Sequence, residues 1–149
     1  MEVVIDSSVL VGLLDINDLW HRQAVVLWDT VKAAGHIGVF FDCVAAEAIS
    51  AAARRLHEKG RSAEVEALLD RLDAQVPNGA ITWILPDVPR LYPAALDLIR
   101  SSAGALNFND ALIALACRER GIPAIASFDS DFDQVAWLRR LARPEDVTP

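Results

Sequence analysis

Val3-Val4-Ile5-Asp6, three β-branched residues that end at an acid, is the stretch from which the fold is predicted. Similar short apolar runs occupy residues 37–41, 81–85 and 123–127. Runs that are apolar on both faces are typical of strands in a parallel sheet that helices cover on each side. The sequence therefore predicts a central sheet of four mainly parallel strands.

Helical patterns fill the intervals between these runs. In residues 62–76 the apolar side chains recur at helical spacing, and charged residues occupy the other side. Further helices are expected from Val9 onward and at residues 20–34, 44–59, 93–102 and 108–120. The alternation of strands and helices predicts an α/β sandwich with right-handed crossovers, in which helices flank a central sheet.

Composition limits the classes of function. The chain has 149 residues without a repeat or linker, so residues 1–149 are predicted to form a single domain. Its net charge of −7 argues against a general basic surface for nucleic acid, so contact with phosphate has to be local or carried by metal ions. No apolar run is long enough for a membrane span and the N-terminus lacks signal-peptide features, which predicts a cytoplasmic protein without a membrane partner.

Acidic residues follow the predicted strands. Asp6 comes directly after the first strand, Asp42 and Glu47 follow the second, and Asp129 and Asp131 follow the fourth. The carboxyl ends of parallel strands meet at one edge of the sheet, where ligands bind. Simpler roles remain open, since Asp6 suits a helix N-cap and Glu47 lies opposite the predicted core face of its helix.

Asp110 is the most informative acid. It opens residues 110–117, a helix that is apolar all the way round and is therefore expected to be buried. A carboxylate there has little water around it, which is costly unless a cation or hydrogen bonds compensate. The alternative is that Asn107 caps the helix and Asp110 serves its first turn, where the helix dipole favours an acid.

Acids that share one edge of a sheet repel one another and need cations. Hard divalent ions with oxygen ligands meet that need, so the sequence predicts Mg²⁺ or Mn²⁺ held by a few carboxylates and waters. An EF-hand is excluded because Gln134 and Arg140 stand where that loop has Gly and an acid. A receiver domain is excluded because Lys32 and Lys59 both precede the last predicted strand.

Four segments carry a resemblance to a known family. They are Val4-Ile5-Asp6-Ser7-Ser8-Val9-Leu10, Ala46-Glu47-Ala48-Ile49, Leu106-Asn107-Phe108-Asn109-Asp110-Ala111-Leu112-Ile113-Ala114 and Ile125-Ala126-Ser127-Phe128-Asp129-Ser130-Asp131-Phe132. In this order the chain resembles a PIN domain, and more narrowly a VapC-like toxin ribonuclease of a type II toxin–antitoxin system, over almost its whole length. The resemblance implies a PIN-like three-layer sandwich.

The resemblance also implies an acidic site. The implied catalytic and metal-binding acids are Asp6, Glu47, Asp110 and Asp129. Asp131 is implied as a further metal ligand. The implied cofactor is Mg²⁺ or Mn²⁺, which agrees with the cation predicted from the residues themselves.

Three polar residues complete the implied site. Ser127 matches a small hydroxyl residue before the last acid, and Ser7 stands beside the first acid. Both are implied to orient phosphate or a metal-bound water. Arg54 lies seven residues after Glu47 on the same helix face, where it would hold RNA phosphate, pair with Glu47 or be solvated.

The implied function is that of a metal-dependent endoribonuclease, the toxin of a toxin–antitoxin pair, in which a metal-activated water attacks an RNA phosphodiester. The implied partners are RNA, a cognate antitoxin and a second copy of the chain in a homodimer. Leu19, Trp20 and Trp28 are candidates for either that contact or the core. Two alternatives remain open: a PIN nuclease that is not a toxin, and a non-catalytic PIN scaffold that binds RNA or a partner.

Overall fold

A parallel sheet of five strands forms the centre of the structure, a computed structural model that describes residues 1–148. The strands are β1 (Glu2–Ile5), β2 (Ile37–Phe41), β3 (Ile81–Thr82), β4 (Ala124–Ala126) and β5 (Arg139–Leu141). They lie in the order β3-β2-β1-β4-β5, and every neighbouring pair is parallel. The α/β class with a mainly parallel sheet is therefore confirmed, and β1 is its central strand.

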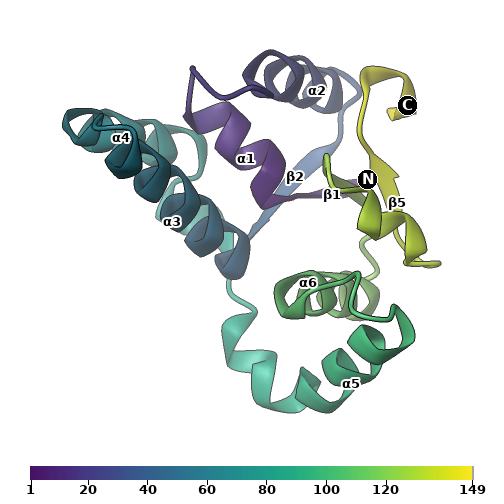
Figure 1. Cartoon of the computed structure of the whole chain (residues 1–149). Helices are drawn as coiled ribbons and strands as arrows, with labels where there is room; N and C mark the ends of the chain where they lie inside the picture. Colours follow the sequence, from purple (N-terminus) through teal and green to yellow (C-terminus); the bar gives the residue numbers. More distant parts are fainter. Residues whose placement is uncertain (149) are drawn as a thin grey trace.

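Six α-helices surround the sheet in the described part of the chain. They are α1 (Ser7–Leu14), α2 (His21–Ala33), α3 (Asp42–Glu58), α4 (Val65–Gln75), α5 (Val88–Ser101) and α6 (Phe108–Arg120). Helix α1 packs against α2, α3 and α4, whereas α5 packs against α6. Figure 1 shows α1 and α2 on one side of the sheet and α5 and α6 on the other, so the three-layer sandwich is confirmed.

Helix α6 is buried, as its apolar sequence predicts. Ile113 and Cys117 pack into the main core, whereas Leu112 and Leu115 pack with Leu91 of α5. The helix is therefore held between the sheet and α5. This packing fixes the position of its N-terminus, where Asp110 lies.

The third strand is shorter than predicted, and the sequence does not predict the fifth. Strand β3 stops at Thr82 because the chain then turns, and the indole of Trp83 faces solvent at 58% exposure. Strand β5 consists of Arg139-Arg140-Leu141 and lies at the edge of the sheet. Edge strands are partly solvated and often carry charged residues, so they lack the apolar runs from which the other strands are predicted.

Helix α5 begins at Val88, five residues before the predicted start at Pro93. Pro89 stands in its first turn, where the missing N–H is not needed. Pro93 lies one turn further on, inside the helix. Pro93, which the sequence predicts as the first residue of the helix, is thus one of its interior residues.

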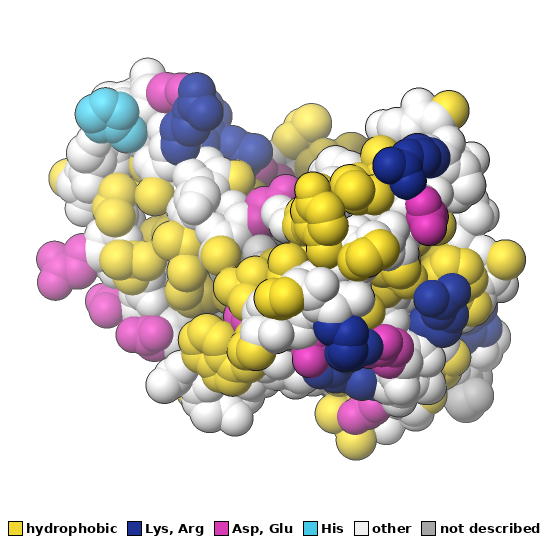
Figure 2. All heavy atoms as spheres, turned by 90° about the horizontal axis from the view of Figure 1, so that it is seen from below, with side chains coloured by type: hydrophobic (Ala, Val, Ile, Leu, Met, Phe, Trp, Pro, Cys, Tyr) yellow, Lys and Arg dark blue, Asp and Glu magenta, His cyan; other side chains and the backbone are white. Residues whose placement is uncertain are grey.

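Charges on the surface occur mostly in mixed groups. Figure 2 shows, on the face seen from below, separate groups of Lys and Arg that stand beside Asp or Glu. On α5 and α6, Arg90 pairs with Glu119 at 2.9 Å and Arg120 with Asp87 at 3.1 Å. Such pairs offset part of the positive charge of the surface.

Cys43 and Cys117 are buried free thiols, as predicted. Burial raises the pKa of each thiol to about 12, so both stay protonated and unreactive. Within residues 1–148, no helix is both long and apolar enough to cross a membrane. The single domain over residues 1–149 stays a prediction, and Pro149 lies outside the described residues.

Asp42, the first acid after β2, has a structural role. Its buried carboxylate accepts hydrogen bonds from the backbone N–H of Cys43 at 2.9 Å, of Ile84 at 3.1 Å and of Leu85 at 2.9 Å. These bonds tie the end of β2 to the turn after β3. Both carboxylate oxygens of Asp42 are thus engaged by backbone donors inside the fold.

We expect Asp42→Ala to lower the free energy of unfolding by about 3 kcal/mol, because the N–H groups of Ile84 and Leu85 lose a charged acceptor. Urea unfolding followed by circular dichroism measures the change. Asp73→Ala, at an exposed position of α4, is the matched control and should change stability by less than about 0.5 kcal/mol. Equal losses in the two variants would contradict this role of Asp42.

Candidate active site

Asp6 lies where β1 passes into α1, at the carboxyl edge of the sheet. Its N–H extends the strand ladder to the carbonyl of Ala126 at 3.0 Å, and its side chain caps α1. Oδ2 accepts hydrogen bonds from the hydroxyls of Ser8 and Ser127, both at 2.7 Å. The N-cap alternative is therefore correct, but it uses only one of the two carboxylate oxygens.

Two serines connect the ends of β1 and β4. The hydroxyl of Ser8 also accepts from the N–H of Phe128 at 3.1 Å, and that of Ser127 accepts from the N–H of Asp129 at 3.0 Å. Ser127 is fully buried, so its hydroxyl holds Asp6 and the loop after β4 in place rather than facing solvent.

Ser8 is a site residue that the sequence interpretation passes over in favour of Ser7. Its place two residues after Asp6 in an Asp-Ser-Ser cap is the signal that identifies it. Ser7 is half-buried and lines a hollow beside Glu47. Both serines line this hollow, and Ser8 in addition orients the carboxylate of Asp6.

Asp110 combines the two roles considered for it. Asn107 and Asp110 form a capping box, with the N–H of Asp110 donating to Oδ1 of Asn107 at 3.0 Å and the N–H of Asn107 donating to Oδ2 of Asp110 at 2.9 Å. Burial raises the pKa of Asp110 to about 6, against the effect of the Asn107 hydrogen bond. The charges of Asp6, Asp129 and Glu47 raise it further, so these acids share one region.

Glu47 lies on the side of α3 that faces this region, not on a solvated surface. Its side chain is half-buried, and Oε2 accepts a 3.4 Å hydrogen bond from the amide of Asn109. Burial raises the pKa of Glu47, the charge of Asp6 adds to the increase, and the Asn109 bond opposes it. Asn109 is a second orienting residue that the sequence interpretation does not single out.

Arg54 is not brought to the acids. It is 79% exposed in its side chain and pairs with Glu58 at 2.8 Å. Arg55 instead lines the hollow beside Glu47, together with Ser7 and Ser8. Helical spacing does not separate the two arginines in this way, because seven residues bring Arg54 back close to the line of Glu47 on α3. The ion pairs differ instead, since Arg54 pairs with Glu58 of the same helix, whereas Arg55 pairs with Asp18 between α1 and α2.

Asp129 begins a short 3-10 turn, Ser130–Gln134, after β4. Its Oδ1 accepts from the N–H of Asp131 at 2.8 Å. Asp131 is half-buried next to it, and its charge does not contribute to the raised pKa values of Asp110 and Glu47. The role of Asp131 as a further ligand stays a prediction.

The chemistry of the four acids suits a hard cation. One oxygen of each accepts hydrogen bonds, and among residues 1–148 no donor reaches Oδ1 of Asp6, Oδ1 of Asp110, Oδ2 of Asp129 or Oε1 of Glu47. No buried side-chain oxygen in this range lacks a partner, so these free oxygens are open to solvent. Free carboxylate oxygens at one edge are what Mg²⁺ or Mn²⁺ prefers.

The four carboxylates do not form a complete set of direct ligands around one point. Over the described residues, no three His, Cys, Asp or Glu side chains converge closely enough to hold an ion directly. Mg²⁺ commonly keeps several waters and few direct carboxylate ligands, so a spaced arrangement of this kind fits a partly hydrated ion.

Comparison with known proteins identifies the family. Residues 3–138 match the model of the PIN domain, so the chain belongs to the PIN domain family. The structure is similar to that of VapC20 from Mycobacterium tuberculosis, described as a sarcin-ricin loop cleaving toxin, with a TM-score of 0.69 and 20% sequence identity over 91% of this chain and 95% of that one. At that identity the likeness concerns the fold. No curated protein matches the sequence.

The raised pKa of Asp110 predicts how stability depends on pH. The folded state keeps the proton up to a pH of about 6, whereas the unfolded chain releases it near the ordinary value of 3.8, so ionisation costs stability as the pH rises through this window. Asp110→Asn avoids this cost. We expect its stabilisation over wild type to grow by about 2 kcal/mol between pH 4.5 and 7.5.

Urea unfolding in EDTA at the two pH values measures this difference. Asp97→Asn, at an exposed residue that pairs only with Arg100, is the matched control and should show no growth. A stabilisation by Asp110→Asn that is the same at both pH values would contradict the assigned pKa.

Proposed function

We propose that this protein is a metal-dependent endoribonuclease of the VapC toxin class, which hydrolyses RNA phosphodiester bonds at the carboxyl edge of its sheet. The proposed catalytic and metal-binding residues are Asp6, Glu47, Asp110 and Asp129. The observation that carries the proposal is that four segments distant in sequence each bring to this edge a carboxylate with one free oxygen. Membership of the PIN domain family supports it.

The proposed cofactor is Mg²⁺ or Mn²⁺. PIN nucleases generally use divalent ions, and the oxygen donors of this site suit them. When bound, such an ion supplies a water of lowered pKa and offsets charge that develops on the phosphate. Asp131, beside Asp129, would be a further ligand of the ion.

The chain's own residues hold the acids in position for this chemistry. Ser8 and Ser127 fix one oxygen of Asp6, so that its other oxygen faces the open site. Asn107 does the same for Asp110. In the proposed complex Ser7, which lines the hollow beside Glu47, donates to a phosphate oxygen.

The biological setting is proposed from the family likeness. VapC20 is described as a toxin that cleaves the sarcin-ricin loop. By analogy we propose that this chain acts on RNA in the cytoplasm, is silenced by a cognate antitoxin and forms a homodimer. The fold of a toxin serves other PIN nucleases equally well, so the toxin role rests on analogy alone.

Asp110→Asn is expected to lower RNA cleavage at least about 100-fold, since loss of one ligand charge removes several kcal/mol of transition-state stabilisation. The assay incubates purified protein with a mixed RNA pool and Mg²⁺ or Mn²⁺, and maps the product ends. EDTA should abolish cleavage, and products of water attack should carry 5′-phosphates. Asp97→Asn is the matched control and should keep full activity.

Two outcomes of this assay would decide against the proposal. Cleavage that persists in both EDTA and Asp110→Asn would place the activity elsewhere, or in a contaminant. RNA binding without cleavage, in antitoxin-free protein supplied with Mn²⁺, would favour the non-catalytic scaffold.

Metal binding can be measured without turnover. At a Mn²⁺ concentration 100 times its dissociation constant, wild type should gain about 2.7 kcal/mol of stability, seen as a raised Tm. Asp110→Asn should gain much less, because one ligand charge is lost. An equal gain in the two proteins would show that the ion binds away from Asp110.

A further inference from the structure

The segment between α1 and α2 carries an exposed aromatic ring next to the acidic site. Trp20 is 47% exposed, and its indole stacks on Phe128 with ring centroids 5.1 Å apart and planes inclined by 22°. Phe128 stands between Ser127 and Asp129, and its N–H is held by Ser8. One face of the indole is thus fixed to the loop that carries the last acid, while the rest of the ring is open to solvent.

Half-buried Asp18 contacts both Trp20 and Arg55 and fixes their relative positions. Its Oδ1 accepts from the N–H of Trp20 at 2.8 Å, and its Oδ2 pairs with Nη1 of Arg55 on α3. His21 adds a 2.7 Å hydrogen bond to the carbonyl of Gly12, which ties the start of α2 to α1. A ring held in this way costs little further ordering when a ligand binds to it.

Two hollows meet at Trp20 and Arg55. One, of about 210 Å³, reaches from these residues to Glu47 and the two serines after Asp6. The other, of about 400 Å³, continues away from the acids and is lined by Asn17, Asp18, Leu19, Trp20, Arg55 and Lys59. The shared residues join the hollows into one path from Glu47 to Lys59.

The path combines an aromatic face with two cations, Arg55, which is paired with Asp18, and Lys59 at the end away from Glu47. Arg55 uses only Nη1 for Asp18, and Lys59 forms no ion pair within residues 1–148. Unpaired nucleobases stack on exposed aromatic rings, and their phosphates lie beside Lys and Arg. Bases in an A-form duplex are already stacked and present no free face.

We propose that Trp20 is the stacking platform for an unpaired nucleobase of the RNA next to the cleaved phosphate, with Arg55 and Lys59 beside the following phosphates. This inference rests on the proposed ribonuclease function and names the form of RNA that the site accepts. Trp20 acts as a positioning residue, because it touches the substrate away from the reacting atoms.

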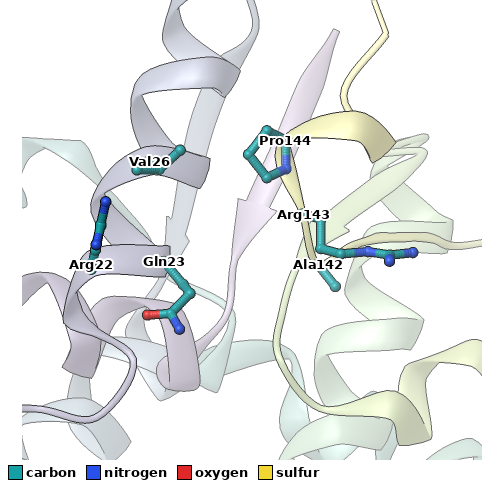
Figure 3. Close-up of a pocket in the computed structure, with 6 residues that line it drawn as sticks. All are labelled: Arg22, Gln23, Val26, Ala142, Arg143 and Pro144. Carbon is teal, nitrogen blue, oxygen red and sulfur yellow. The ribbon is translucent and has the colours of Figure 1, made fainter.

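Another hollow of the molecule does not offer an equivalent site. A cavity of about 360 Å³ between α2 and the segment after β5 is lined by Arg22, Gln23, Val26, Ala142, Arg143 and Pro144. Figure 3 shows the side chain of Arg143 pointing away from α2, so the two arginines do not converge on one point. None of the four site acids lines this cavity.

Fluorescence anisotropy with a labelled single-stranded RNA decamer of mixed sequence tests the platform. Asp110→Asn protein serves as the parent, so that binding is measured without cleavage. Adding Trp20→Ala should raise Kd about tenfold, whereas Trp20→Phe should stay within about threefold of the parent. Trp83→Ala is the matched control, since Trp83 is 58% exposed and lines neither hollow, and it should leave Kd unchanged.

Further arms separate the competing explanations. The decamer annealed to its complement should bind equally to the parent and to the Trp20→Ala protein. Circular dichroism and the Tm should show that each variant is folded, and light scattering should show an unchanged oligomeric state. A drop from dimer to monomer in Trp20→Ala would mean that Trp20 contacts a second copy, which overturns the platform.

Different results would contradict the Trp20 stacking proposal and the ribonuclease proposal. If wild type cleaves RNA and Trp20→Ala binds within twofold of its parent, the platform is wrong and the ribonuclease proposal stands. If wild type neither binds nor cleaves the RNA, both proposals fail. An equal loss in Trp20→Ala and Trp83→Ala would also overturn the platform, because the effect would not be specific to the path.

Discussion

The hydrogen bonds that Ser8 and Ser127 donate to Asp6 are the contacts on which the candidate site depends. They join the ends of β1 and β4 through a single carboxylate oxygen. The same two hydroxyls accept hydrogen bonds from the N–H groups of Phe128 and Asp129, which fixes the start of the loop after β4. The loop that carries the last acid is therefore positioned by the first acid, which stands on the central strand of the sheet.

The site gathers negative charge at a cost in stability. Asp110 is buried among other acids, and its pKa is raised because ionising it there costs more free energy than in water. Backbone donors offset part of this cost through the capping box at the start of α6. Packing of α6 between the sheet and α5 fixes the Asp110 carboxylate at a position where its ionised form is unfavourable unless a cation offsets the charge. Locally unfavourable residues of this kind are expected at functional sites rather than in structural parts of a protein.

The sequence predicts those parts that depend on apolar pattern and on spacing along one chain segment. The strand of Val3-Val4-Ile5 and the buried helix after Asn107 follow from their own residues, and the four acids follow from family motifs. Two features depend on tertiary contacts: the edge strand Arg139-Arg140-Leu141, and the pairing with Asp18 that places Arg55 beside the hollow at Glu47. The hydrogen bonds that Asp42 accepts from the N–H groups of Ile84 and Leu85 likewise depend on tertiary structure.

Strand β5 has a consequence for when the site can exist. The N–H of Ser127 donates to the carbonyl of Leu141 at 3.1 Å, so the end of β4 is anchored by one of the later segments of the chain. Asp129 stands 123 residues after Asp6 in the chain. The last acid is therefore held beside the first only once residues 139–141 have paired with β4, so completion of the site waits for the edge strand to be added to the sheet.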